Sequence, residues 1–210
     1  MATAAKLPKP SLYRVHPSVA MVEKWITELP AKTGRSIDEW IALVKKSGPL
    51  TEKERREWLK KEHKLGSNTA WWIAERAGGQ GGMNSEAEAY LKAAERFVAD
   101  MFSGKKSGLA PLYAELLKLG FQMGKDVKAC PCKTMVPLYR KHVFAQIKPT
   151  TNTRIDFGLA LGDRKTPKRL INIGGFEKKD RITHRIEITQ LSEIDEEVKR
   201  WLKTAYEGDK

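Results

Sequence analysis

The apolar positions in the first part of the chain recur with the period of an α-helix. Ser36 is followed, at the spacing i, i+3, i+4, i+7, by Ile37, Trp40, Ile41 and Val44. Ser36 and Thr51 each precede a glutamate by three residues, which is the spacing of a helix-capping box. Residues 18–77 are therefore predicted to form a small module of short helices.

The helical period returns after residue 84. A long helix is expected to carry on one face Tyr90, Leu91, Ala94, Phe97, Val98 and Met101. A second helix is expected to end with Gly120 at its C-terminal cap. Ser192 is expected to cap a final helix that carries Val198 and Leu202.

Between the second and the final of these helices the period changes to that of a β-strand. Apolar residues alternate over 143–148 and 154–161, and further strands are indicated by Ile171, Ile173, Ile182, Ile186 and Ile188. The short connection at 149–153 favours antiparallel pairing. The order of the elements predicts an α+β fold, with helices packed on one face of a mainly antiparallel sheet.

A glycine-rich segment divides the chain. Four of the five residues from Gly78 to Gly82 are glycines, which disfavours a helix and indicates a flexible linker. We therefore expect an N-terminal tail at 1–17, a helical module at 18–77, a linker at 78–84 and an α+β module at 85–207.

Composition indicates a cytoplasmic protein. The two cysteines, Cys130 and Cys132, give no disulfide framework, which fits a reducing compartment. No apolar run approaches the roughly 20 residues that span a bilayer. Residues 1–10 lack the apolar stretch of a secretory signal, so no membrane partner is expected.

The formal net charge of +13 is concentrated in one region. From Lys118 to Arg181 there are 15 lysines and arginines against 5 acidic residues, a net charge of +10. Such an excess favours nucleic acid or another polyanion as partner, although it is also compatible with a role in solubility alone.

The predicted sheet and its loops supply the candidate site for a polyanion. Phe144 shares a strand face with Lys148, so its ring would stack on a base between phosphate contacts. The alternative is that Phe144 is buried under a helix. The candidate residues are Arg140, Lys141, Phe144, Lys148, Arg154, Lys168 and Arg169.

Two weaker patterns concern metals and catalysis. Neighbouring lysines would lower a thiol pKa in the Cys-Pro-Cys segment, and the candidate metal ligands are Cys130, Cys132, His142 and His184. Buried structural cysteines are the alternative. The candidate catalytic residues, arranged loosely as in metal-dependent nucleases, are Asp156, Glu177 and Lys179. The sequence indicates no cofactor.

The chain resembles two bacterial modules. Residues 33–40 (TGRSIDEW) and 58–66 (WLKKEHKLG) resemble domain of unknown function 4287. Residues 141–149 (KHVFAQIKP), 154–159 (RIDFGL) and 201–206 (WLKTAY) resemble domain of unknown function 5655. The resemblance implies a pairing of two modules and no activity.

Other binding modes remain open. Residues 58–65 and 67–76 around Gly66 could form a helix-turn-helix, but the turn is short and Glu62 occupies a position that usually holds a small residue. Trp71 and Trp72 could instead line a cleft for a protein or a small ligand. The sequence favours a non-enzymatic binding protein with weak, sequence-tolerant affinity for nucleic acid or another polyanion. A metal-dependent nuclease and a protein-interaction or small-ligand module are the alternatives, and no protein partner can be named.

Overall fold

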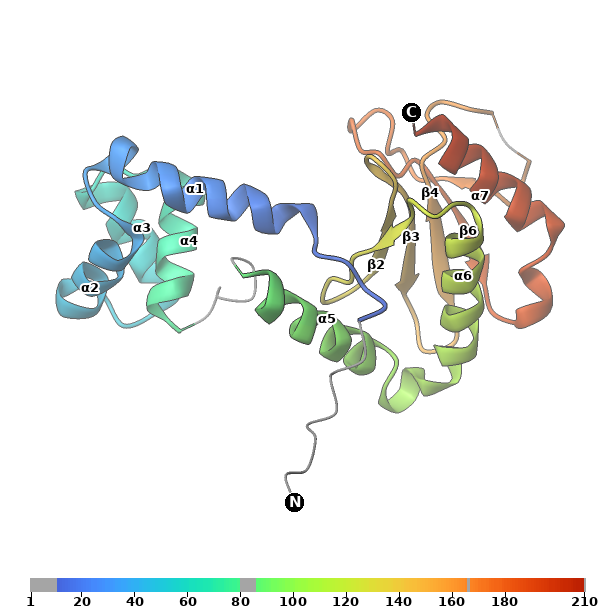
Figure 1. Ribbon diagram of the computed structural model, residues 1–210, viewed down its shortest axis with the longest axis horizontal. Helices are drawn as coiled ribbons and strands as arrows, with labels where there is room; N and C mark the ends of the chain where they lie inside the picture. Colours follow the sequence, from blue (N-terminus) through green and yellow to red (C-terminus); the bar gives the residue numbers. More distant parts are fainter. Residues whose placement is uncertain (1–10, 80–85, 166, 210) are drawn as a thin grey trace, which may run out of the picture. The chain divides into compact units, whose positions relative to one another are not determined.

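The computed structural model describes residues 11–79, 86–165 and 167–209 (Figure 1). The chain divides into two units, and each is described by itself. The N-terminal unit is Val15–Ala93, and the C-terminal unit is Ala94–Lys210 together with the segment that precedes Val15. Residues 80–84 of the predicted linker lie outside the described residues, whereas Gly78 is the C-cap of the preceding helix.

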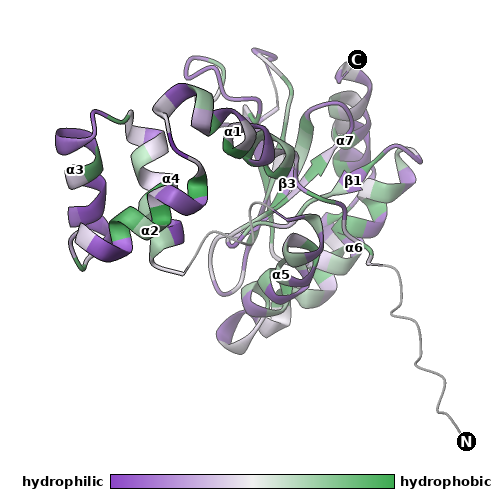
Figure 2. Cartoon of the chain, turned by 60° about the vertical axis from the view of Figure 1, so that its left-hand side comes forward, coloured by the Kyte–Doolittle hydropathy of each residue, from purple (hydrophilic) through white to green (hydrophobic). Residues whose placement is uncertain are grey.

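The N-terminal unit is helical, as the sequence predicts. Its helices are α1 (Pro17–Thr33), α2 (Ile37–Ser47), α3 (Glu52–Glu62) and α4 (Ser67–Ala77). They enclose a small core that includes Leu29, Trp40, Val44, Leu59 and Ile73. Figure 2 shows hydrophobic residues on α2 and α4 and mostly hydrophilic residues along α3. The apolar periodicity of the sequence therefore marks the buried faces.

Ser36 forms the predicted capping box at the start of α2. Its hydroxyl accepts a hydrogen bond from the Glu39 backbone N–H at 3.3 Å, and the Glu39 carboxylate accepts one from the Ser36 N–H at 2.7 Å. Because both bonds satisfy backbone donors that the helix leaves unpaired, Ser36→Ala is expected to lower the free energy of unfolding by about 1 kcal/mol. Urea denaturation followed by tryptophan fluorescence measures the change, since five of the six tryptophans lie in this unit. Lys45→Ala, at an exposed position of the same helix, is the control, and an equal loss there would contradict the capping role.

The C-terminal unit is built around a six-stranded antiparallel sheet of strand order β1-β2-β3-β4-β6-β5. The strands are β1 (Lys128–Ala129), β2 (Val136–Tyr139), β3 (Val143–Pro149), β4 (Ile155–Leu159), β5 (Ile171–Asn172) and β6 (His184–Ile188). The helices are α6 (Ala110–Gln122), α7 (Glu196–Gly208) and the part of α5 (Ala87–Met101) from Ala94 onward, with 3-10 turns at η2 (Gly104–Leu109) and η3 (Leu191–Glu193). The predicted α+β fold is confirmed.

The two faces of this sheet differ in character. Helices α6 and α7 cover one face, where Ile147 pairs with Phe157 and both side chains are fully buried (Figure 1). On the other face Asp156 lies between Lys148 and Glu187 of the neighbouring strands. The period-two pattern therefore separates a core face from a charged face.

Three local features differ from the sequence prediction. Gly120 lies inside α6 rather than at its end, and a Cβ there would lie 2.6 Å from Leu138 Cδ1, so the glycine permits β2 to approach the helix. Asp195, not Ser192, caps α7, because its carboxylate accepts hydrogen bonds from the backbone N–H groups of Glu197 and Val198. The short strands β1 and β2 were not predicted. Across the described residues, no helix combines the length and apolar character needed to cross a membrane.

Candidate functional site

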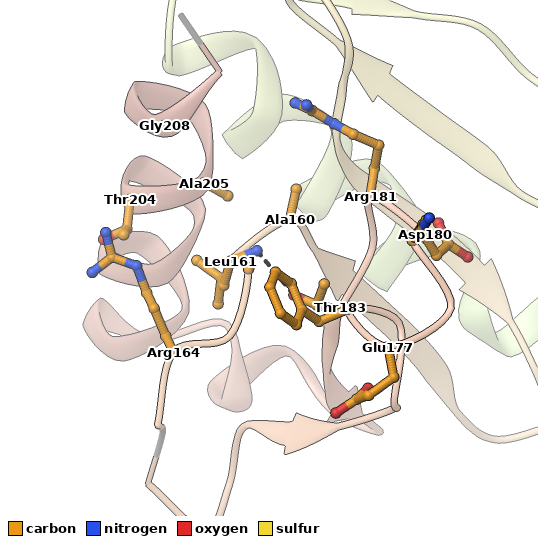
Figure 3. Close-up of a pocket in the computed structure, with 13 residues that line it drawn as sticks. Ala160, Leu161, Arg164, Glu177, Asp180, Arg181, Thr183, Thr204, Ala205 and Gly208 are labelled. Atoms are coloured by element: carbon orange, nitrogen blue, oxygen red, sulfur yellow. Dashed lines mark hydrogen bonds between the residues drawn. The ribbon is translucent and has the colours of Figure 1, made fainter.

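A hollow of about 710 Å³ opens beside the C-terminal end of α7, and we call it the α7 hollow (Figure 3). Three segments line it: the residues that follow β4, the loop between β5 and β6, and the last turns of α7. Small residues on two of these segments, Ala160, Gly162, Ala205 and Gly208, leave its interior open. The hollow therefore belongs to the C-terminal unit alone.

Two backbone hydrogen bonds lie within residues 175–180 of the β5–β6 loop. The N–H of Asp180 donates to the carbonyl of Gly175 at 2.8 Å, and the N–H of Lys179 donates to that of Phe176 at 3.0 Å. Lys179 adopts a φ of 57°, which is uncommon for a residue other than glycine. The segment that follows β4 is connected to the residue that precedes β6, because the Leu161 N–H donates to Thr183 Oγ1 at 3.1 Å (Figure 3).

Asp209 joins three separate parts of the C-terminal unit. Its buried carboxylate accepts hydrogen bonds from the backbone N–H groups of Lys141 and His142 at 3.0 and 2.8 Å. It also pairs with Arg181 of the β5–β6 loop at 2.6 Å. Burial alone would raise the pKa of Asp209, but the hydrogen bonds from His142 and the charge of Arg181 bring this pKa below its ordinary value. The carboxylate therefore connects the β2–β3 turn, the loop and the end of α7.

His142 is oriented by the same carboxylate. Its Nδ1 lies 2.9 Å from Asp209 Oδ1, while 58% of its side chain is exposed. An imidazole held by a buried carboxylate has the geometry of a general base. The same carboxylate accepts a hydrogen bond from the backbone N–H of His142, so the contacts between the two residues hold the β2–β3 turn.

The arginines predicted to contact a polyanion are engaged within the protein. Arg140 pairs with Asp126 at 2.8 Å, and its guanidinium lies over the Tyr206 ring at 4.5 Å. Arg169 pairs with Asp195 and Glu197 at the start of α7. Arg154 pairs with carboxylates of β4 and β6 on the charged face of the sheet. The structure places these three arginines at three different locations.

Phe144 is not available for stacking. Its side chain is 0% exposed and packs edge-on against Tyr206 of α7, with ring centroids 5.6 Å apart. The predicted role of Phe144 as a stacking platform is wrong, because the ring belongs to the core between β3 and α7. The alternative that the sequence left open, burial under a helix, is the one observed.

The predicted lysines lie at both ends of β3 and beyond. Lys141 is exposed at the β2–β3 turn and Lys168 in the loop after β4. Lys148 lines a second opening of about 550 Å³ together with Lys106 and Lys133, and we call it the lysine hollow. Lys106 also donates to the carbonyl of Pro149 at 2.6 Å. Lys106, Lys133 and Lys148 therefore line one opening, although they come from distant parts of the sequence.

The candidate metal ligands do not gather. Burial raises the pKa of Cys130 to about 12 and also raises the pKa of Cys132, so neither thiol has the lowered pKa that neighbouring lysines could produce, and Cys130 is buried as in the alternative interpretation. His142 contacts Asp209, and His184 is buried beside Thr183 at 2.9 Å. No three histidine, cysteine or acidic side chains of the described residues are arranged to hold a metal ion.

The candidate catalytic residues are likewise separated. Asp156 lies on the charged face of the sheet between Arg154 at 2.9 Å and Arg185 at 2.8 Å. Glu177 and Lys179 line the α7 hollow, whose lining does not include Asp156. The structure gives Asp156 two cationic partners, which is the environment of a structural ion pair.

Sequence reasoning missed Asp209, Arg164 and Phe176. Asp209 follows the last turn of α7, where the helix dipole disfavours a negative charge, so its position was a possible signal of a buried cationic partner. Arg164 and Phe176 line the α7 hollow from two different loops. Neither of them had a local pattern that pointed to a cavity.

Comparison with known protein families agrees with the two modules. The family described as domain of unknown function (DUF4287) matches residues 22–77. The family described as domain of unknown function (DUF5655) matches residues 98–208, which is more than half of the 210 residues. No curated protein and no solved structure matches the chain. The chain belongs to the DUF5655 family.

Proposed function

We propose that the C-terminal unit binds nucleic acid or another polyanion, weakly and without sequence preference, as a non-enzymatic binding protein. The observation that carries the proposal is the lysine hollow. Lys106 comes from η2, Lys133 from the segment after β1 and Lys148 from β3, and Asp100 is the one acidic residue that lines the opening. Positive charge therefore exceeds negative charge around a concave surface.

The ion pairs of the unit explain why lysines carry this proposal. The arginines of the basic region that lie on the sheet and at the start of α7 already contact carboxylates. Among the ion pairs of the described residues, none involves Lys133 or Lys148. A lysine ammonium contacts phosphate oxygens as a point charge, whereas reading of a guanine edge commonly uses the paired donors of arginine. Sequence-tolerant binding is the result expected from this arrangement.

The length of β3 sets the expected length of the ligand. Lys141 precedes the strand and Lys148 lies near its end, seven residues later, so about 23 Å separates them at about 3.3 Å per residue. At the spacing of about 3.4 Å per phosphate of a stacked strand, about seven nucleotides would span the distance. Binding is expected to strengthen as an oligonucleotide grows to that length and then to change little per site.

The test is fluorescence anisotropy with labelled single-stranded DNA and RNA of different lengths across a salt series. Lys133→Gln combined with Lys148→Gln is expected to weaken binding and to reduce the slope of log K against log salt by about 0.7 for each lysine that contacts phosphate. Lys118→Gln combined with Lys203→Gln is the control, because it removes the same charge from exposed positions on α6 and α7. Binding that is independent of salt, or an equal loss in the control, would refute the proposal.

A further inference from the structure

We infer that the α7 hollow is a binding site for a small organic anion that carries a planar apolar group. The inference does not rest on the proposed polyanion binding, because the α7 hollow and the lysine hollow share no lining residue. The volume of the α7 hollow, about 710 Å³, lies within the range of about 300–1,000 Å³ that is usual for small-molecule sites.

The apolar part of the site is Phe176 and the wall beside it. Phe176 is 53% exposed, although it lies in the β5–β6 loop among charged residues. Leu161 and Ala205 line the same hollow and are themselves nearly buried. An aromatic ring exposed in a concave, partly apolar site offers a stacking surface for a planar group.

The charged part of the site is Arg164 with Lys179. Arg164 is exposed, and in the view of Figure 3 its side chain extends toward Thr204, across the hollow from Arg181. Arg181 is already paired with Asp209, whereas no ion pair among the described residues involves Arg164 or Lys179, the other two cations of the lining. A guanidinium can hold a carboxylate or a phosphate through two parallel hydrogen bonds.

The two acidic residues of the lining have different roles. Asp180 Oδ1 accepts a hydrogen bond from the Ile182 N–H at 3.2 Å and so belongs to the loop structure. The carboxylate of Glu177 lies near Gly174, on the part of the rim formed by the same loop (Figure 3). It is placed to accept a hydrogen bond from a hydroxyl or amino group. A ligand that combines an anion with such a donor fits better than a bare anion.

The backbone that carries three of the residues proposed to contact the ligand is hydrogen-bonded. Two backbone hydrogen bonds and the buried Gly175 support the segment that carries Phe176, Glu177 and Lys179. Because less loop ordering is then needed on binding, more of the interaction energy contributes to affinity. The hollow therefore has the preorganisation expected of a binding site.

Isothermal titration calorimetry on the full chain tests the inference with four probes: adenosine 5′-monophosphate, adenosine, benzoate and inorganic phosphate. Adenosine 5′-monophosphate and benzoate combine a ring with an anion. Each is expected to bind at least about tenfold more tightly than phosphate or adenosine, a difference of about 1.4 kcal/mol in binding free energy. Tighter binding of the nucleotide than of benzoate would identify a phosphate ester with hydroxyl groups as the preferred class of ligand. The reverse order would identify an aromatic carboxylate.

Variants distinguish this site from the lysine hollow. Arg164→Gln and Phe176→Ala are each expected to weaken binding of the better probe about tenfold and to leave the melting temperature unchanged, because both side chains are exposed. Lys148→Gln is the matched control and is expected to leave binding unchanged. The inference is overturned if phosphate binds as tightly as the organic anions, if no probe binds at millimolar concentration, or if Lys148→Gln weakens binding as much as Arg164→Gln.

Discussion

Asp209→Ala is expected to lower the free energy of unfolding of the C-terminal unit by about 3 kcal/mol. The substitution leaves the backbone N–H groups of Lys141 and His142 without their acceptor, and it leaves Arg181 without its carboxylate. Because the Asp209 side chain is 1% exposed, water does not replace these contacts fully. Urea denaturation of the variant measures the loss.

The effect should depend on pH. Since the pKa of Asp209 is lowered in the folded protein, its contribution is complete above the ordinary carboxyl pKa of about 4 and is lost as the pH falls through the lowered value. The stabilities of the wild type and the variant are therefore expected to converge in acid. Glu207→Ala is the control, because Glu207 is an exposed carboxylate in the last turn of α7, two residues before Asp209, with an ion pair at 3.7 Å to Lys203. A loss in Glu207→Ala as large as that in Asp209→Ala would show that the contacts of Asp209 are not the cause.

Gly175→Ala is expected to destabilise the C-terminal unit by about 3 kcal/mol and to abolish ligand binding in the α7 hollow. A Cβ at this position would lie 2.2 Å from the carbonyl oxygen of Ile182 and 2.9 Å from the Cα of Thr183. Both are backbone atoms that lead into β6, so the loop has to separate from the strand. That movement displaces Phe176 and Lys179, which line the hollow.

Thermal unfolding and calorimetric titration of the same sample measure the two effects. Gly108→Ala is the matched control, because a Cβ at Gly108 meets nothing within 4 Å. The free energy of unfolding of this variant is expected to change by less than about 0.5 kcal/mol. If Gly175→Ala retained wild-type stability, the close approach of the loop to β6 would be refuted. If it lost stability but kept ligand binding, the β5–β6 loop would not be part of the binding site.

The helices and the fold class could be predicted from the sequence because their signals are local. The capping box of Ser36 and Glu39 involves residues three positions apart, and the apolar stripe of α2 repeats within two turns. The antiparallel sheet followed from alternation and from the short connection after β3. The strand β2 gave no such signal, because it has four residues and contains Pro137.

The cap of α7 shows a limit of local signals. Ser192 and Asp195 are both suitable N-cap residues, and they lie three positions apart. The 3-10 turn η3 takes up Ser192, and Asp195 then caps the helix while also pairing with Arg169. Helix propensity alone does not select Asp195 over Ser192 as the N-cap. The selection of Asp195 is accompanied by its ion pair with Arg169, which lies 26 positions away in the sequence.

The candidate site could be predicted only as a region. The excess of positive charge between Lys118 and Arg181 is a property of the sequence, and the lysine hollow and two of the three lining segments of the α7 hollow draw on it. Which cations remain available was decided by the tertiary structure, because an ion pair depends on distance in space. Arg181 meets Asp209, 28 residues later, whereas Lys133 and Lys148 meet Lys106 across a concave surface.

The sequence by itself determined the helices, the class of the sheet and the sign of the charge, since each depends on near neighbours or on composition. The tertiary structure alone decided that Phe144 is core, that Arg140, Arg154 and Arg169 pair with carboxylates and that the α7 hollow and the lysine hollow are separate, since each depends on side chains brought together from distant segments.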